Sequence, residues 1–321
     1  MLPEATKEKT IFVGRSTNIS SMLKDTVNPK NIRLINKAFE KEKPSHVYLH
    51  NYHLLNHSIA KACRKHGGKF IYHAHEPHAE NKRAHGGFHH YWLYLNEYMI
   101  SRLLRKADVA VVSSKEGSRL FDKAYPWFQG RKMEVPLMYE DAVENLSYAE
   151  ERKYLTFVGP PVPAKGPEIF LSIVDYAAEH GLDWAFLLVS REKIADRRFL
   201  DKDNLLIYHK ERISDEEYGT LMQKSLAVLT PYKRETQSSV VLVSYMYGTP
   251  VVSSNVGGLP EFVSCGRTGY VVDEAAPVEE WVEAIGQTLK DEQAMSANCR
   301  RYFVENFSGK NWGKYLDDML A

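Results

Sequence analysis

The hydrophobic and polar positions of this chain alternate between two patterns, short apolar runs and longer segments with apolar residues at helical spacing. In 31–43, for example, apolar residues recur three or four positions apart, which is typical of an amphipathic helix. The first half predicts helices at 31–43, 58–66, 93–106 and 114–124, and strands at 10–14, 46–50, 69–74, 108–113 and 134–138. An alternation of strands and helices predicts a parallel sheet with helices on both faces.

The same pattern restarts in the second half of the chain. We predict helices at 167–180, 215–224, 240–247 and 278–289, and strands at 154–159, 184–189, 205–208, 227–230, 250–254 and 269–273. The acidic and polar segment 139–152 separates the halves and is interpreted as a linker. The fold class is therefore α/β with two Rossmann-like domains, and the default site is a cleft between them.

Composition narrows the class of protein. The length of 321 residues suits two domains, and the net charge of +1 argues against a nucleic-acid-binding protein. Three widely spaced cysteines form neither a disulfide framework nor a zinc motif. The polar N-terminus resembles no signal peptide, and no apolar run reaches the ~18 residues of a membrane span. We therefore expect a cytoplasmic protein.

One stretch, 230–261, combines several features of a ligand site. A polar loop with Glu235 leads into the apolar helix 240–247, which Gly248 ends. A short strand at 250–254 follows, and Gly257 and Gly258 form a tight turn at its carboxyl end. Ligands bind at this end of strands in open α/β sheets, and helix N-termini there favour anions.

A second stretch, 157–166, is a proline-rich loop between a strand and a helix. Gly159 and Gly166 allow the backbone to approach a phosphate closely, and Lys165 supplies a countercharge.

These two stretches together resemble the family-4 retaining glycosyltransferases of the GT-B fold, and the match is strongest from 157 to 273. The resemblance implies an acceptor-side Rossmann-like domain at 1–150 and a nucleotide-sugar donor domain at 151–305. A C-terminal helix at 306–321, marked by Phe307 and Ser308, would cross back to the first domain. The donor would be a UDP or GDP sugar, and the family implies neither a further cofactor nor a metal.

The resemblance also assigns roles to individual residues. Gly159, Lys165 and Gly166 would bind the donor diphosphate. Glu235 would lie near the donor sugar as a catalytic residue, and His75, at the end of a strand, would contact the transferred sugar, with His73 as the competing choice. The remaining residues expected at the donor sugar or nucleotide are Ser238, Ser239, Val243, Gly257, Gly258 and Glu261.

The sequence departs from the family pattern at two positions. Pro160 stands where the family has an arginine, and Val243 stands where a second glutamate binds the ribose hydroxyls. Since valine accepts no hydrogen bond, we expect recognition of the ribose to be weaker or to be supplied by another residue, with Glu261 and Ser244 as the candidates.

Six of the 13 histidines fall between His73 and His90, which raises the alternative of a metal site. Their spacings are irregular and have no recurring Cys or Asp partners, so we expect no metal. The aromatic run 91–95, followed by Arg102, Arg105 and Lys106, raises a second alternative, peripheral contact with a membrane. The helical spacing of its apolar residues favours core packing instead.

We therefore predict a glycosyltransferase that moves a sugar from a nucleotide-diphosphate donor to a glycan, lipid-linked or protein acceptor with retention of configuration. The alternative is a catalytically degenerate protein of the same fold that serves as a binding or scaffold subunit of a glycosyltransferase complex. An oxidoreductase is disfavoured because no Gly-x-Gly-x-x-Gly follows the first strand.

Overall fold

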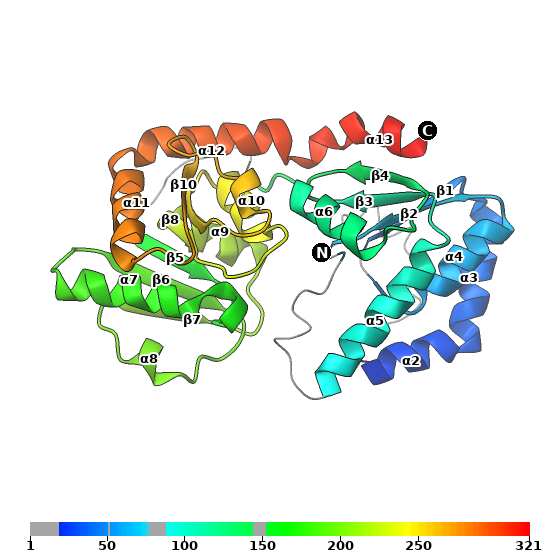
Figure 1. Ribbon diagram of the computed structural model, residues 1–321, viewed down its shortest axis with the longest axis horizontal. Coiled ribbons are helices and arrows are strands. Elements are labelled where there is room, and N and C mark those ends of the chain that lie inside the picture. The colour runs from blue at the N-terminus through cyan, green and yellow to red at the C-terminus, as the bar shows by residue number, and fades with distance from the viewer. Residues whose placement is uncertain (1–18, 51, 76, 78–87, 144–151) are drawn as a thin grey trace. The chain divides into compact units, whose positions relative to one another are not determined.

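The computed structural model describes residues 19–50, 52–75, 77, 88–143 and 152–321. The chain divides into two compact units (Figure 1). The first comprises Met1–Ser113, Gly117–Val135 and Met319–Ala321, and the second comprises Ser114–Glu116 and Pro136–Asp318. The strand predicted at 10–14 lies outside the described residues.

The first unit is built on a parallel sheet with strand order β1-β2-β3-β4. Its elements are α2 (Ile19–Val27), α3 (Pro29–Glu42), β1 (His46–His50), α4 (Asn56–Lys65), β2 (Lys69–His73), α5 (Phe88–Leu104), β3 (Val109–Val112), α6 (Lys115–Ala124) and β4 (Arg131–Glu134). Helix α4 packs on β1 and β2 and also contacts α3 and α5. The β2 and β3 side chains are almost all buried, as expected for central strands of a parallel sheet covered on both faces.

The second unit contains a six-stranded parallel sheet with strand order β10-β9-β8-β5-β6-β7. Its elements before the last strands are β5 (Tyr154–Val158), α7 (Pro167–Glu179), β6 (Ala185–Ser190), α8 (Arg197–Leu200), β7 (Leu205–His209), α9 (Asp215–Gln223), β8 (Ser225–Thr230) and α10 (Ser239–Met246). They are followed by β9 (Val251–Ser254), β10 (Gly269–Val272), α11 (Val278–Lys290), α12 (Glu292–Asn306) and α13 (Gly313–Leu320). The α/β class with parallel sheets is therefore confirmed.

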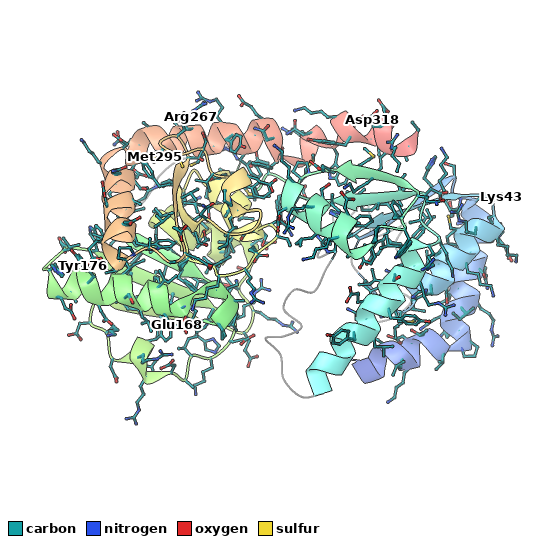
Figure 2. All side chains as sticks on the ribbon, in the orientation of Figure 1. Lys43, Glu168, Tyr176, Arg267, Met295 and Asp318 are labelled. Carbon is teal, nitrogen blue, oxygen red and sulfur yellow. The ribbon has the colours of Figure 1, made fainter. Side chains whose placement is uncertain are left out.

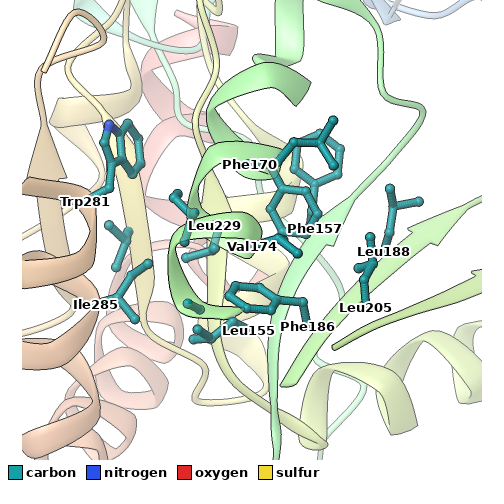
Figure 3. Close-up of a cluster of buried hydrophobic side chains, with 14 of the residues drawn as sticks. Leu155, Phe157, Phe170, Val174, Phe186, Leu188, Leu205, Leu229, Trp281 and Ile285 are labelled. Carbon is teal, nitrogen blue, oxygen red and sulfur yellow. The ribbon is translucent and has the colours of Figure 1, made fainter. Parts of the chain in front are cut away.

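Alternating side chains of this sheet form two separate hydrophobic cores. Phe157 of β5 and Leu229 of β8 point to the face covered by α7 and α11, where they pack with Phe170 and Trp281 (Figure 3). The opposite face packs against α10 and α12. Complete burial of the Trp281 side chain alone contributes roughly 2–3 kcal/mol to the packing of α11 on its face of the sheet.

Most predicted elements agree with the structure to within two residues at each end, but α5 and β4 do not. The helix predicted at 93–106 starts at Phe88 and ends at Leu104. The prediction placed the strand at 134–138, whereas it spans Arg131–Glu134 and pairs with β3 from Val109↔Arg131 to Val112↔Glu134. An edge strand pairs on one side only and tolerates polar side chains, so its apolar content is a poor guide.

The C-terminal helix predicted at 306–321 is also wrong in its bounds. Helix α12 ends at Asn306, because Ser308 is extended and the segment around it pairs with Tyr139. The Tyr139 N–H donates to the Phe307 carbonyl, and the Gly309 N–H donates to the Tyr139 carbonyl. Helix α13 starts only at Gly313.

The segment 139–152 is not simply a linker where the structure describes it. Val143 is buried in the second unit, and the Asp141 carboxylate makes a two-point ion pair with Arg300 at 2.8 and 2.7 Å. This pair anchors the segment to α12.

The aromatic run in α5 differs from the expected core packing. Tyr94, Leu95 and Tyr98 are each about half exposed, whereas Leu103 and Leu104 are buried. Only the C-terminal end of α5 therefore contributes to the core among the described side chains. No helix in the described part of the chain is both long and apolar enough to cross a bilayer.

Candidate functional site

The strand order of the second unit reverses direction between β5 and β8. From β5 the chain adds β6 and β7 on one side, and it then returns to add β8, β9 and β10 on the other. Because all pairs are parallel, the loops after β5, β6 and β8 leave the same edge of the sheet. This is the topological switch point at which open α/β sheets bind ligands.

A pocket of about 860 Å³ lies at this edge, entirely within the second unit. Its walls are formed by the loop after β5, the turn after β6, the start of α9, helix α10 and the segment 139–142. The lining residues are Tyr139, Glu140, Asp141, Ala142, Val158, Gly159, Pro160, Lys165, Val189, Arg191, Glu192, Ile213, Asp215, Tyr218, Ser239, Val240, Val243, Met246 and Tyr247.

The Lys165 ammonium lies directly over Gly159 in the wall of this pocket. Gly159 has a φ of 109°, and a Cβ there would be only 2.3 Å from Lys165 Nζ. Glycine is therefore required twice, for its backbone conformation and for the space that the ammonium occupies. The Lys165 Nζ donates to the Val158 carbonyl at 3.3 Å and lies 5.2 Å from the centre of the Tyr232 ring.

The charge on Lys165 is partly desolvated. Burial lowers the pKa of this lysine below its ordinary value, and the Glu235 carboxylate nearby opposes that shift. An ammonium in such surroundings interacts more strongly with an anion than a solvated lysine does, because less water competes for it.

Gly166 joins the loop after β5 to helix α7. Its φ is 61°, and a Cβ there would lie 1.8 Å from the Pro231 carbonyl oxygen, so the loop after β8 fits closely against it. Helix α7 begins at the next residue, and Glu168 lies in its first turn (Figure 2). The Glu168 carboxylate pairs with Lys233 at 3.4 Å. Gly166 is buried and shapes the loop, but it does not line the pocket.

Gly257 and Gly258 are contacted by the backbone of the loop that carries Glu235. A Cβ at Gly257 would be 1.7 Å from the Glu235 carbonyl oxygen, and one at Gly258 would be 2.0 Å from that of Thr236. The Gly258 N–H donates to the Glu235 carbonyl at 3.1 Å. Both glycines therefore position the Glu235 loop, and neither lines the pocket.

Three predicted residues lie at the start of α10 or within it. Ser238 is the buried N-cap residue, whereas Ser239 and Val243 line the pocket. The apolar Val243 side chain lies in the wall of the pocket together with Val240 and Met246.

Glu261 lies outside the pocket. Its two carboxylate oxygens accept hydrogen bonds from the backbone N–H groups of Lys115 and Glu116 at 2.7 and 2.8 Å, residues that group with the second unit. Ser244, the other residue considered for the ribose, is fully buried and donates to the Val240 carbonyl. Neither Glu261 nor Ser244 lines the pocket, and a ribose contact of either residue stays a prediction.

Sequence reasoning missed two parts of the pocket. The segment 139–142 was interpreted as a linker, although Tyr139 and Asp141 line the pocket. Arg191 and Glu192 were also missed. They follow the end of β6, where the Ser190 hydroxyl holds a tight turn by donating to the Glu192 carbonyl at 2.8 Å. Their position directly after a predicted strand was the signal that could have identified them.

The first unit holds the predicted His75. Its Nε2 lies 2.9 Å from the ring nitrogens of His50, and its ring stacks on that of His73. Burial, and then the neighbouring His50, lowers the pKa of His75 to about 4. The competing candidate, His73, is buried and has both ring nitrogens in hydrogen bonds, whereas His75 is partly exposed.

Comparison with known proteins identifies relatives of the second unit. Residues 152–291 match the profile of the family described as "Glycosyl transferases group 1". The D-inositol 3-phosphate glycosyltransferase of Corynebacterium diphtheriae is 31% identical over 150 residues, which cover 44% of this chain and 35% of that protein. The enzyme of the same name from Mycobacteroides abscessus is 35% identical over 182 residues, which cover 53% of this chain and 39% of that protein. The chain thus spans well under half the length of these curated relatives.

Solved structures share the fold over most of the chain. Anabaena HepE in complex with UDP has a TM-score of 0.67 at 15% identity, with 91% of this chain and 82% of that chain covered. Sucrose-phosphate synthase from Thermosynechococcus elongatus has a TM-score of 0.67 at 18% identity, with 96% and 80% covered. These likenesses confirm the predicted GT-B fold. The resemblance to group 1 glycosyltransferases is confirmed for 152–291, and family 4 and retention stay predictions.

Proposed function

We propose that this chain is a glycosyltransferase that binds a nucleotide-diphosphate sugar in the pocket of its second unit and transfers the sugar with retention of configuration. The premise is that residues 152–291 match the group 1 glycosyltransferases. The donor is a UDP or GDP sugar, and no further cofactor takes part. The observation that carries the proposal is the partly desolvated Lys165 ammonium over Gly159, at the switch point of a parallel sheet.

Lys165 would act on the leaving group. As the bond between the sugar and the diphosphate breaks, negative charge grows on the diphosphate, and a preorganised cation stabilises that charge more than it stabilises the ground state. The amino end of α7, which begins directly after Gly166, adds a positive dipole end to the same loop.

Arg191 would supply a second positive charge. It lines the same pocket from the end of β6, whereas Pro160, the position at which the family has an arginine, is uncharged. A guanidinium on the neighbouring strand therefore compensates for the missing cation of the loop after β5.

The sugar and nucleoside would be held by other groups. We propose that Ser239 and the Glu235 loop contact hydroxyls of the donor, and that the apolar wall with Val243 packs on the nucleoside. Anabaena HepE, which shares the fold, was solved in complex with UDP. The roles of His75 and of the first domain as the acceptor side stay predictions.

The acceptor class stays open between glycans, lipid-linked sugars and proteins. The curated relatives are named for D-inositol 3-phosphate. An acceptor screen should therefore include this compound beside simple sugars and a lipid-linked glycan, with release of UDP or GDP as the readout.

Isothermal titration calorimetry with UDP and GDP tests the proposal. We expect one of the two to bind at a single site and Lys165→Ala to weaken it roughly 10- to 150-fold, the equivalent of one charge-assisted hydrogen bond. Lys153→Ala is the matched control, because Lys153 precedes the other end of β5 and does not line the pocket. Absence of binding of both nucleotides at millimolar concentration would contradict the proposal.

A second candidate is a degenerate protein that binds the nucleotide without transferring a sugar, as a subunit of a glycosyltransferase complex. The observation that favours it is that both departures from the family, Pro160 and Val243, line the pocket itself. Donor-hydrolysis assays on the isolated chain separate the two, since the second candidate predicts UDP or GDP binding with no turnover. Affinity capture followed by mass spectrometry would then recover a glycosyltransferase partner.

A further inference from the structure

Three histidines come together at the carboxyl edge of the first sheet. His50 is the last residue of β1 and His73 is the last residue of β2, and the two are direct partners in the strand pairing. His75 follows two positions after His73, beyond the end of β2, and its ring stacks on that of His73. Each histidine offers one ring nitrogen, and the three nitrogens lie within 4.8 Å of one another.

The contacts between these rings bring nitrogen against nitrogen. His75 Nε2 lies 2.9 Å from Nδ1 and from Nε2 of His50, and the His73 and His75 rings stack with their centres 4.1 Å apart. A neutral imidazole has one acceptor nitrogen, whose lone pair lies in the plane of the ring. The rings are stacked or tilted against one another, so rotation of the His50 and His75 side chains would direct the three lone pairs at one cation.

The surroundings fix the orientation of the most buried ring. His73 Nδ1 lies 2.6 Å from the Tyr48 hydroxyl, and its Nε2 lies 2.7 Å from the Ser113 hydroxyl. A metal-bound histidine usually donates the N–H of its other ring nitrogen to a hydrogen-bond acceptor, which fixes the orientation of the ring. The hydrogen bond between His73 Nδ1 and the Tyr48 hydroxyl can therefore remain, while Nε2 loses its hydrogen bond to Ser113 and binds a metal ion instead.

Burial supports the same conclusion. His73 is 2% exposed and His75 is partly exposed, whereas His50 is exposed. Burial of the first two favours the neutral imidazole, which is the form that coordinates a metal. No carboxylate or thiol belongs to this group among the described residues. An all-imidazole set suits zinc, cobalt, nickel or copper and not magnesium or calcium.

We propose that His50, His73 and His75 form a binding site for a divalent transition metal, with three protein ligands and a fourth position open to water or a small anion. Three histidines with one open position are a known zinc arrangement. The proposal does not depend on the glycosyltransferase function, since all three residues belong to the first unit. The expectation of no metal rested on the irregular spacing within 73–90, on the lack of recurring Cys or Asp partners and on the family resemblance. It did not consider His50, which strand pairing brings next to His73.

The test uses the full chain, dialysed against a chelator, with Cys265→Ser as the background because Cys265 is an exposed free thiol. Zinc chloride is titrated calorimetrically, and cobalt chloride is titrated while the visible absorption is followed. We expect one ion per chain and the intense cobalt absorption of a four-coordinate site. His50→Ala and His75→Ala should each weaken binding at least about 100-fold, and Tyr48→Phe roughly 10- to 100-fold.

His46→Ala is the matched control, because His46 starts the same strand at its other end. Its zinc affinity should equal that of the background protein. Thermal unfolding of each variant checks that it is folded. If an alanine variant does not fold, the zinc affinity of His75→Gln is the deciding measurement. Zinc binding that His75→Gln leaves unchanged, or a cobalt spectrum of the weak octahedral type, would overturn the proposal.

Discussion

The Gly159→Ala substitution tests whether the position of the Lys165 ammonium matters, because it displaces the ammonium without removing the lysine. The new Cβ would lie 2.3 Å from Lys165 Nζ, and because ordinary contacts are about 3.5–4 Å, the ammonium must move by more than about 1 Å. The φ of 109° adds roughly 1–3 kcal/mol of backbone strain. The lysine itself remains in the protein.

Two measurements follow from this geometry. Chemical denaturation should show a loss of about 1–3 kcal/mol in the free energy of unfolding. Calorimetric titration with the preferred nucleotide should show a loss of affinity approaching the roughly 10- to 150-fold expected for Lys165→Ala, because a displaced ammonium forfeits most of a charge-assisted hydrogen bond.

Gly181→Ala is the control for strain alone. Gly181 also has a positive φ, of 64°, but a Cβ there would have no atom within 4 Å. It should cost about 1–2 kcal/mol of stability and leave nucleotide affinity unchanged. If the Gly159→Ala protein binds the nucleotide as tightly as the wild type, the ammonium does not need its observed position for binding.

Three further predictions concern other features of the second unit. Val243→Glu places a carboxylate in the pocket wall and should strengthen binding of UDP relative to 2′-deoxy-UDP by roughly tenfold or more, as seen by calorimetry; equal gains for both would exclude a ribose contact. Lys165→Met should raise the free energy of unfolding of the ligand-free protein at neutral pH, because burial lowers the pKa of this lysine in the folded state below its unfolded value of 10.5. Between these two pKa values the unfolded chain binds more protons than the folded protein, so the free energy of unfolding of the wild type rises with pH. The difference in free energy of unfolding between Lys165→Met and the wild type should therefore become smaller as the pH rises. A difference that stays constant with pH in chemical denaturation would contradict this. Ser214→Ala removes the capping box that Ser214 forms with Glu217 and should cost about 0.5–2 kcal/mol in thermal unfolding, whereas Ser172→Ala, on the exposed side of α7, should cost less.

The alternation of short apolar runs and helical periods was enough to predict nearly all strands of both sheets. The central strands are covered on both faces, so their hydrophobic runs reflect their burial directly, as in 227–230 and β8. The edge strands β1, β7 and β10 were predicted as well, although their side chains are less completely buried. Strand β4 failed for the opposite reason, since its polar residues RKME are placed by pairing with β3 and not by burial. Helix α12 was missed although Met295, Cys299 and Phe303 recur at helical spacing and are buried.

The site was predictable where a local motif specified it. Gly159 and Lys165 are six residues apart in one loop, and the structure brings their atoms together. Arg191, Tyr139 and Asp141 reach the same pocket from other segments, and only the strand order and the Asp141–Arg300 ion pair place them there. For the same reason His50 could not be joined to His73 from the sequence, because the pairing of β1 with β2 decides that contact.

A crystal structure of the protein in complex with UDP or GDP, whichever binds, tests the central claim most directly. The account predicts a diphosphate oxygen within about 2.7–3.2 Å of Lys165 Nζ, at the carboxyl end of β5. A nucleotide bound elsewhere, or one whose phosphates turn away from this loop while Lys165 keeps its contact with the Val158 carbonyl, would contradict it.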